Sequence, residues 1–250
     1  MQCEILSSGL RLSAFLAQPP VPVATPTPGL ILCHGFPAGP GGAATSGQTY
    51  PELAERLAAD TGWAVLAFNL RGTGTSEGNF SLAGWLDDVR AAIDFMLDTG
   101  VAGVWLLGSS TGGGLAICQA GEDERVRGVA TLSARADFSD WAADPASFLA
   151  HARSIGVIRD RDFPPDPVAW GRELAEIRPI NLVGKIPPRP ILLIHGAMDD
   201  TVPLQDARIL ADAASDAVEL RVLAEAGHRL RHDPRAVALV IGWMERQAAH

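Results

Sequence analysis

The chain has 250 residues, 47% hydrophobic and 20% charged, which fits one globular domain with a substantial core. Its net charge of −9 argues against a nucleic-acid partner, because phosphate binding depends on clustered Lys and Arg. No apolar run is long enough to span a membrane, and the first residues lack the basic and apolar stretches of a secretory signal. We therefore expect a cytoplasmic protein.

The three cysteines cannot all pair with one another, and Cys33 and Cys118 lie in apolar segments where a thiol behaves as a small buried hydrophobe. No CxxC pair or His/Cys cluster has the spacing of a metal site. The sequence predicts no metal and no organic cofactor. It leaves the oligomeric state open, a homo-oligomer included.

The chain begins with a hairpin signal at Ser8-Gly9, and residues 19–28 are a proline-rich stretch that we interpret as an extended surface connection. Apolar runs then alternate with helix-length amphipathic segments. Strands are predicted at Leu30–Cys33, Ala64–Phe68, Val104–Leu107, Val126–Leu132, Ile191–Ile194 and Val218–Leu223. Helices are expected from Thr49-Pro51, with Thr49 as the cap, from Ser81, after Gly112–Gly114, after Pro203 and from Asp233-Pro234. This alternation predicts an α/β fold with a doubly wound, mostly parallel sheet of about eight strands.

Residues 134–188 break the alternation, since a single crossover helix needs far fewer residues. The segment contains Trp141, Phe148 and Trp170 and is divided by prolines. We interpret it as a small helical cap inserted into a core made of residues 1–133 and 189–250.

The strongest local motif is Gly108-Ser109-Ser110-Thr111-Gly112, a G-x-S-x-G sequence between an apolar strand and a helix-like segment. Such a turn projects its central serine, here Ser110, above the sheet edge as a nucleophile. The flanking glycines remove side chains that would obstruct a strained turn. The Thr111 amide, at the helix start, would point toward a developing oxyanion. A glycine-rich phosphate loop or an ordinary turn is the alternative, although G-x-G-x-x-G and Gly-Lys-Ser/Thr motifs are missing from this segment.

The chain resembles the α/β-hydrolase superfamily, in which a serine, an acid and a histidine follow one another in that order. The segment His195-Gly196-Ala197-Met198-Asp199-Asp200-Thr201-Val202-Pro203 looks like the family's HGxxDxxVP motif. The resemblance implies Asp199 as the acid, with Asp200 as the alternative. Ala226-Gly227-His228 looks like the family's AGH loop and implies His228 as the base, with His232 as a weaker candidate.

Two further segments extend the resemblance. His34-Gly35-Phe36 looks like the family's HGx loop, which implies that the Phe36 amide is a second oxyanion donor and that His34 supports the loop. Residues 71–76 resemble the family's R-G-x-G-x-S loop, which implies a structural role for Arg71. The matches span residues 30–230.

The resemblance to small-capped esterases, monoacylglycerol-lipase-like and serine aminopeptidase-like members implies a serine esterase that works through an acyl-enzyme. The aromatic residues of the insertion favour a small to medium apolar ester, with Trp141, Phe148 and Trp170 as substrate-binding candidates. An aminopeptidase or amidase, a C–C bond hydrolase and an acyltransferase use the same triad. An aminopeptidase would need carboxylates for the substrate amine, and the insertion offers Asp137, Asp140, Asp144, Glu173 and Glu176. A non-catalytic binding module is the remaining alternative.

Overall fold

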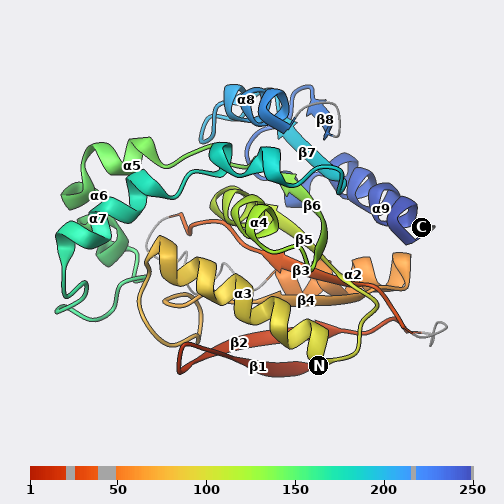
Figure 1. Ribbon diagram of the computed structural model, residues 1–250, viewed down its shortest axis with the longest axis horizontal. Coiled ribbons are helices and arrows are strands. Elements are labelled where there is room, and N and C mark those ends of the chain that lie inside the picture. Colours follow the sequence, from red (N-terminus) through yellow and green to blue (C-terminus); the bar gives the residue numbers. More distant parts are fainter. Residues whose placement is uncertain (21–25, 39–48, 215–217, 249–250) are drawn as a thin grey trace.

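The computed structural model describes residues 1–20, 26–38, 49–214 and 218–248 (Figure 1). Its centre is an eight-stranded sheet with the order β1-β2-β4-β3-β5-β6-β7-β8. The hairpin β1–β2 pairs antiparallel with β4, and all strands from β3 to β8 run parallel. The strands are β1 (Gln2–Ser7), β2 (Leu10–Ala17), β3 (Gly29–Cys33), β4 (Ala64–Phe68), β5 (Val104–Ser109), β6 (Val126–Leu132), β7 (Ile191–Gly196) and β8 (Val218–Leu223).

The predicted fold class is confirmed, since each apolar run became a strand and the Ser8-Gly9 signal became the β1–β2 turn. Ser8 and Gly9 have φ values of 50° and 82°, the left-handed conformation that a tight hairpin turn requires. The predicted connection at 19–28 lies partly outside the described residues, because these omit 21–25.

Helices cover both faces of the sheet, which explains why the central strands are apolar throughout rather than alternating. Along β3, Ile31 belongs to the buried cluster that includes residues of α3, α4 and α8, whereas Leu30 and Leu32 belong to the cluster that includes residues of α2 and α9. Figure 1 shows α3 and α4 in front of the sheet. These helices are α2 (Tyr50–Thr61), α3 (Leu82–Asp98), α4 (Thr111–Glu122), α8 (Leu204–Ala214) and α9 (Pro234–Ala248).

The predicted helix starts are largely right, with one correction. Ser81 caps α3 by accepting a hydrogen bond from the Gly84 amide. Thr49 stands at the N-cap position of α2 but its side chain makes no capping bond. Its backbone is already helical there, with φ −94° and ψ −8°, and its hydroxyl instead accepts a hydrogen bond from Arg231.

The segment between β6 and β7 forms three short helices grouped at one end of the molecule (Figure 1), followed by two 3-10 turns that lie against α4 and α8. Asp144 and Asp166 cap the second and third of them through backbone amides. The third helix also packs against α3. These elements are α5 (Ser139–Ala143), α6 (Pro145–Ser154), α7 (Pro167–Glu176), η1 (Pro179–Asn181) and η2 (Val183–Lys185). Within the described residues, no helix combines the length and the apolar character that crossing a membrane requires.

Candidate active site

Ser110 occupies the sharp turn between β5 and α4 with φ 54° and ψ −119°, a conformation that is strained for any residue with a side chain. The flanking glycines allow this turn to form. A methyl group on Gly108 would lie 2.3 Å from the Gly112 carbonyl oxygen, and one on Gly112 would lie 2.3 Å from the carbonyl oxygens of Cys33 and His34. The predicted local geometry is therefore present, and only glycine fits at these two positions.

Neighbouring strands hold the turn in place. The Ser110 amide donates to the Leu132 carbonyl at the end of β6 (2.9 Å). On the opposite side, a methyl group on Gly35 would lie 3.0 Å from Ser110 Cβ, so the loop after β3 packs closely against the serine. Ser110 is 8% exposed.

Asp199 and His228 form a hydrogen-bonded pair. His228 Nδ1 lies 2.9 Å from Asp199 Oδ2 and 3.1 Å from Oδ1. Because a carboxylate only accepts, Nδ1 carries the proton, which leaves Nε2 of a neutral ring free to accept one. The Asp199 carboxylate is fully buried, whereas the His228 side chain is 22% exposed.

The electrostatics of this pair favour a charged aspartate. Burial alone would raise the pKa of Asp199, but hydrogen bonds from His228 and from the amides of Val202 and Thr201 outweigh it. These donors hold the pKa of Asp199 well below its ordinary value. The carboxylate is therefore ionised at neutral pH and can stabilise a positive charge on His228.

The two loops that carry this pair are joined by backbone hydrogen bonds. Ala197 donates to the Leu223 carbonyl and Met198 to the Ala226 carbonyl, both at 2.9 Å. The contact is close, because a methyl group on Gly196 would lie 2.4 Å from the Ala226 oxygen. The β7 and β8 loops therefore form one packed unit around the Asp199–His228 pair.

A cavity of about 540 Å³ brings most of the predicted site residues together. Ser110 and His228 both line it, and among the described residues the Ser110 hydroxyl has no hydrogen-bond partner, His228 included. Asp200 also lines this cavity, whereas His232 does not and lies in the short helix η4 (Leu230–His232). The lining consists of Phe36, Pro37, Ala38, Ser110, Thr111, Arg135, Trp141, Phe148, His151, Asp200, Thr201, His228 and Arg229.

Two backbone amides at the cavity are unpaired. Phe36 and Thr111 both line it, and within the described chain neither N–H donates to another backbone carbonyl or to a side chain. Thr111 is the first residue of α4, so its amide has no intrahelical acceptor and lies at the positive end of the helix dipole.

His34 stands behind the Phe36 loop. Its Nδ1 lies 2.8 Å from the Gly35 carbonyl, so Nδ1 donates, and its Nε2 accepts from the Leu70 amide (3.1 Å). Burial lowers the pKa of His34 to about 4, so the ring is neutral at pH 7. These bonds join the loop after β3 to the loop after β4, as expected for a supporting histidine.

Arg71 anchors the β4 loop through a buried partner that the sequence did not identify. The fully buried Asp88 carboxylate, on α3, accepts from the Arg71 amide (2.7 Å), Nε (3.0 Å) and Nη2 (2.7 Å). It also accepts from the Ser7 hydroxyl (2.7 Å). The helical spacing placed Asp88 on α3, but no sequence signal pointed to a loop 17 residues away.

Aromatic rings form one wall of the cavity. The Phe36 ring lies 5.1 Å from Trp141 and 5.2 Å from Phe148, and these two rings stack at 4.2 Å. Trp170 requires a correction, because it is not among the described residues that line the cavity. It is 3% exposed, stacks on Phe148 and donates its indole N–H to the Phe80 carbonyl, because α7 directs it into the buried cluster that joins the insertion to the main core.

The cavity also contains charged side chains that the sequence analysis missed. Arg135, the third residue after β6, places its guanidinium carbon 4.8 Å from the Trp141 ring centre and donates to Asp140 (2.8 Å). Arg229 directly follows His228. No sequence motif marked either arginine, because each depends on how the loops fold back over the sheet edge.

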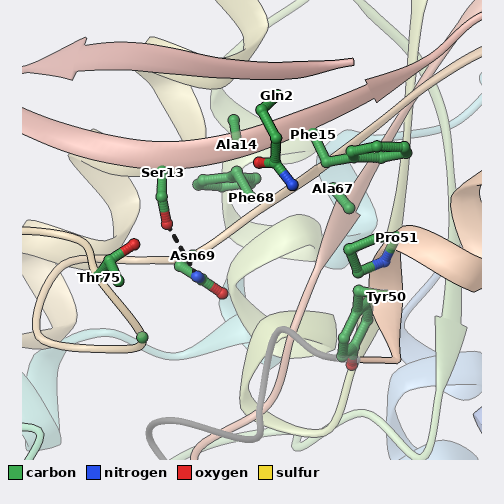
Figure 2. A pocket seen from close by; sticks show the side chains of 11 residues that line it. Gln2, Ser13, Ala14, Phe15, Tyr50, Pro51, Ala67, Phe68, Asn69 and Thr75 are labelled. Carbon is green, nitrogen blue, oxygen red and sulfur yellow. Dashed lines mark hydrogen bonds between the residues drawn. The ribbon is translucent and has the colours of Figure 1, made fainter.

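A second cavity, of about 290 Å³, lies beside β2 and β4 and contains none of the predicted site residues (Figure 2). Asn69 donates there to the Ser13 hydroxyl at 2.9 Å, and no charged side chain is in its described lining. Among the residues that the structure describes, no group of three or more His, Cys, Asp and Glu side chains could hold a metal ion.

Comparison with known proteins places this geometry in context. A family model described as alpha/beta hydrolase fold matches residues 28–173. The chain is 29% identical over 167 residues to the uncharacterized protein YfhR of Escherichia coli O157:H7, a match that covers 66% of this chain and 52% of that protein. The chain thus spans about half the length of the YfhR proteins it matches.

Two further proteins match over nearly the whole chain. The 2-hydroxymuconate semialdehyde hydrolase of Pseudomonas sp. (strain CF600) is 27% identical over 278 aligned residues, covering 95% of this chain and 91% of that protein. Among solved structures, Est1E from Butyrivibrio proteoclasticus with bound ferulic acid has a TM-score of 0.71 at 22% identity, covering 99% and 98%. The similarity to Est1E shows a shared fold.

Proposed function

Because this chain belongs to the alpha/beta hydrolase fold family, we propose that it is a serine hydrolase that cleaves a carboxylic ester of a small to medium apolar substrate. The observation that carries the proposal is the Asp199–His228 pair facing the cavity that Ser110 also lines. Similarity to both an esterase and a C–C bond hydrolase is consistent with hydrolytic chemistry on this fold.

In the proposed reaction, His228 Nε2 removes the Ser110 proton as the serine oxygen attacks the ester carbonyl. Asp199 holds the ring in the required tautomer and stabilises the imidazolium. The Ser110–His228 hydrogen bond forms when substrate closes the site, since such bonds commonly tighten only in the complex. The protonated ring then donates to the leaving alcohol, and water hydrolyses the acyl-enzyme with His228 again as the base.

The amides of Phe36 and Thr111 form the proposed oxyanion hole. Both are unpaired among the described residues and both line the cavity. Each such donor contributes about 3 kcal/mol to lowering the barrier. Phe36 thus has two roles, with its amide serving the oxyanion and its ring joining the aromatic wall.

We further propose that residues 134–188 act as the cap, over a core of residues 1–133 and 189–250. Trp141 and Phe148, from this segment, supply the apolar surface for the substrate. Trp170 supports that wall from behind.

Within the described insertion, the aminopeptidase alternative finds no carboxylate at the cavity, and four of its five candidates already have partners. Asp137 and Asp144 accept from backbone amides near helix starts, Asp140 pairs with Arg135, and Glu173 accepts from the Ala83 amide. None of the insertion's described carboxylates lines the cavity. A C–C bond hydrolase is the second candidate, on the similarity to the semialdehyde hydrolase.

The test is fluorophosphonate labelling together with hydrolysis of 4-nitrophenyl hexanoate. We expect the wild-type protein to do both, and Ser110→Ala to do neither while keeping its melting temperature. Ser109→Ala, with a neighbouring serine of the same 8% exposure, is the matched control and should retain turnover. Labelling that survives in Ser110→Ala would refute the assignment of the nucleophile.

A further inference from the structure

The charges lining the candidate active-site cavity have a sign opposite to that of the whole chain. The chain carries a net charge of −9, yet Arg135 and Arg229 line the cavity against one described carboxylate, Asp200. His151 also lines it. A concave, partly apolar site with an excess of cations attracts anions.

Arg135 is held in a fixed position. Its side chain is 13% exposed, and its guanidinium lies over the Trp141 ring at 4.8 Å, a cation–π arrangement that limits its motion. Its amide lies 3.4 Å from the Ser110 carbonyl oxygen, so the backbone that carries Arg135 is close to that of the proposed nucleophile. A fixed guanidinium loses less conformational entropy when it binds a ligand.

The guanidinium also keeps donors free. Both oxygens of Asp140 are bonded to the same nitrogen, Nη1, at 2.8 and 3.0 Å. Among the described residues, Nε and Nη2 of Arg135 have no hydrogen-bond partner, and neither is a fully buried unpaired atom. Nε and Nη2 form one edge of the guanidinium fork, the edge that binds a carboxylate through two parallel hydrogen bonds.

Arg229 adds a second positive charge beside the catalytic histidine. It is exposed, and no ion pair or side-chain hydrogen bond joins it to the described chain. A substrate anion would therefore meet it without displacing an internal partner.

We propose that the substrate carries a carboxylate, bound by Arg135 with Arg229 nearby, in addition to the ester bond that Ser110 attacks. The substrate class is then the half-ester of a dicarboxylic acid whose apolar stem lies on Trp141 and Phe148. This inference rests on the proposed esterase function and narrows its substrate class. The Arg135 fork selects the free carboxylate, and the neutral ester carbonyl is left to the amides of Phe36 and Thr111.

The experiment compares mono(4-nitrophenyl) adipate with 4-nitrophenyl hexanoate, which differ only in a terminal carboxylate in place of a methyl group. We expect the wild-type kcat/KM to be about tenfold or more higher for the half-ester. Arg135→Met should lower the ratio of the two values by about 10- to 100-fold, as expected for losing charge-assisted hydrogen bonds. Arg135→Lys keeps the charge but not the fork, so its ratio should lie between those of the wild type and Arg135→Met.

Arg161→Met is the matched control, because it removes the same charge from a side chain that is 92% exposed and outside the cavity lining. Its ratio should equal that of the wild type. A wild-type ratio at or below one overturns the proposal, and so does a high ratio that survives in Arg135→Met.

A second measurement does not depend on turnover. Hexanoate should protect Ser110 from fluorophosphonate labelling at lower concentration than the neutral hexanamide, and Arg135→Met should abolish the difference. Equal protection by the carboxylate and the amide overturns the carboxylate site while the serine hydrolase stands. Absence of labelling in the wild type overturns the proposed function, and with it this inference.

Discussion

Replacing Asp88 by Asn should destabilise the protein strongly, because it leaves a buried cation without its counter-charge. The Asp88 carboxylate is 0% exposed and the Arg71 side chain 12% exposed. Breaking one side of such a pair costs about 3–5 kcal/mol. Asn retains some of the hydrogen bonds from the Arg71 amide and Ser7, so we expect the lower end, about 3 kcal/mol. For a chain of this length that is a fall in melting temperature of about 6–12 °C.

Asp87→Asn provides the matched control one residue away. Asp87 pairs with Arg90 on the surface of α3, where the side chains are 42% and 51% exposed, and such pairs contribute at most about 0.5 kcal/mol. Differential scanning calorimetry on both variants measures the contrast. A loss in Asp88→Asn no larger than that in Asp87→Asn would refute the argument that burial makes the Arg71–Asp88 pair important.

Two other predictions concern His34 and the choice between Asp199 and Asp200. His34 has a folded pKa of about 4, below its ordinary 6.5, so its stabilising effect is complete above pH 6.5 and is lost as pH falls toward 4. In urea unfolding, the free energy of unfolding of the wild type should fall by about 3 kcal/mol across that pH window, and that of His34→Gln should not. Equal slopes against pH for the two proteins would contradict this. Asp199→Asn should lower kcat by about 10⁴-fold, while Asp200→Asn changes it less than about tenfold, and steady-state kinetics that reverse this order would exchange the two roles.

The fold could be predicted from the sequence because its signals are local. The apolar run at Ala64–Phe68 is buried along its whole length, and the Ser81 cap and the Ser8-Gly9 turn depend only on neighbours. The same reasoning failed at Thr49, where the choice between a capping bond and a bond to Arg231 is settled by α2 packing near α9.

The candidate-site residues were predictable where a sequence motif constrains the backbone. They were not predictable where packing determines which side chains face the cavity. Ser110, Asp199 and His228 follow strands in motifs with a defined position, so their meeting at one sheet edge could be expected. Trp170 and Arg135 carry no such constraint. Whether a tryptophan faces a cavity or the core behind it depends on the rotation of a short helix, which apolar spacing alone leaves open. The cytoplasmic location stays a prediction from the sequence, which leaves the oligomeric state open.

The backbone bonds between the β7 and β8 loops determine how this site can adjust. Asp199 and His228 are carried by two loops that are bonded to each other, whereas Ser110 is bonded to β6 and packed against the loop after β3. A substrate that reshapes the site would therefore move the imidazole and carboxylate together, as one rigid body relative to the serine. Under the proposed mechanism, the distance that varies is the one across which the proton moves from Ser110 to His228, and the tautomer of the ring is preserved as that distance changes.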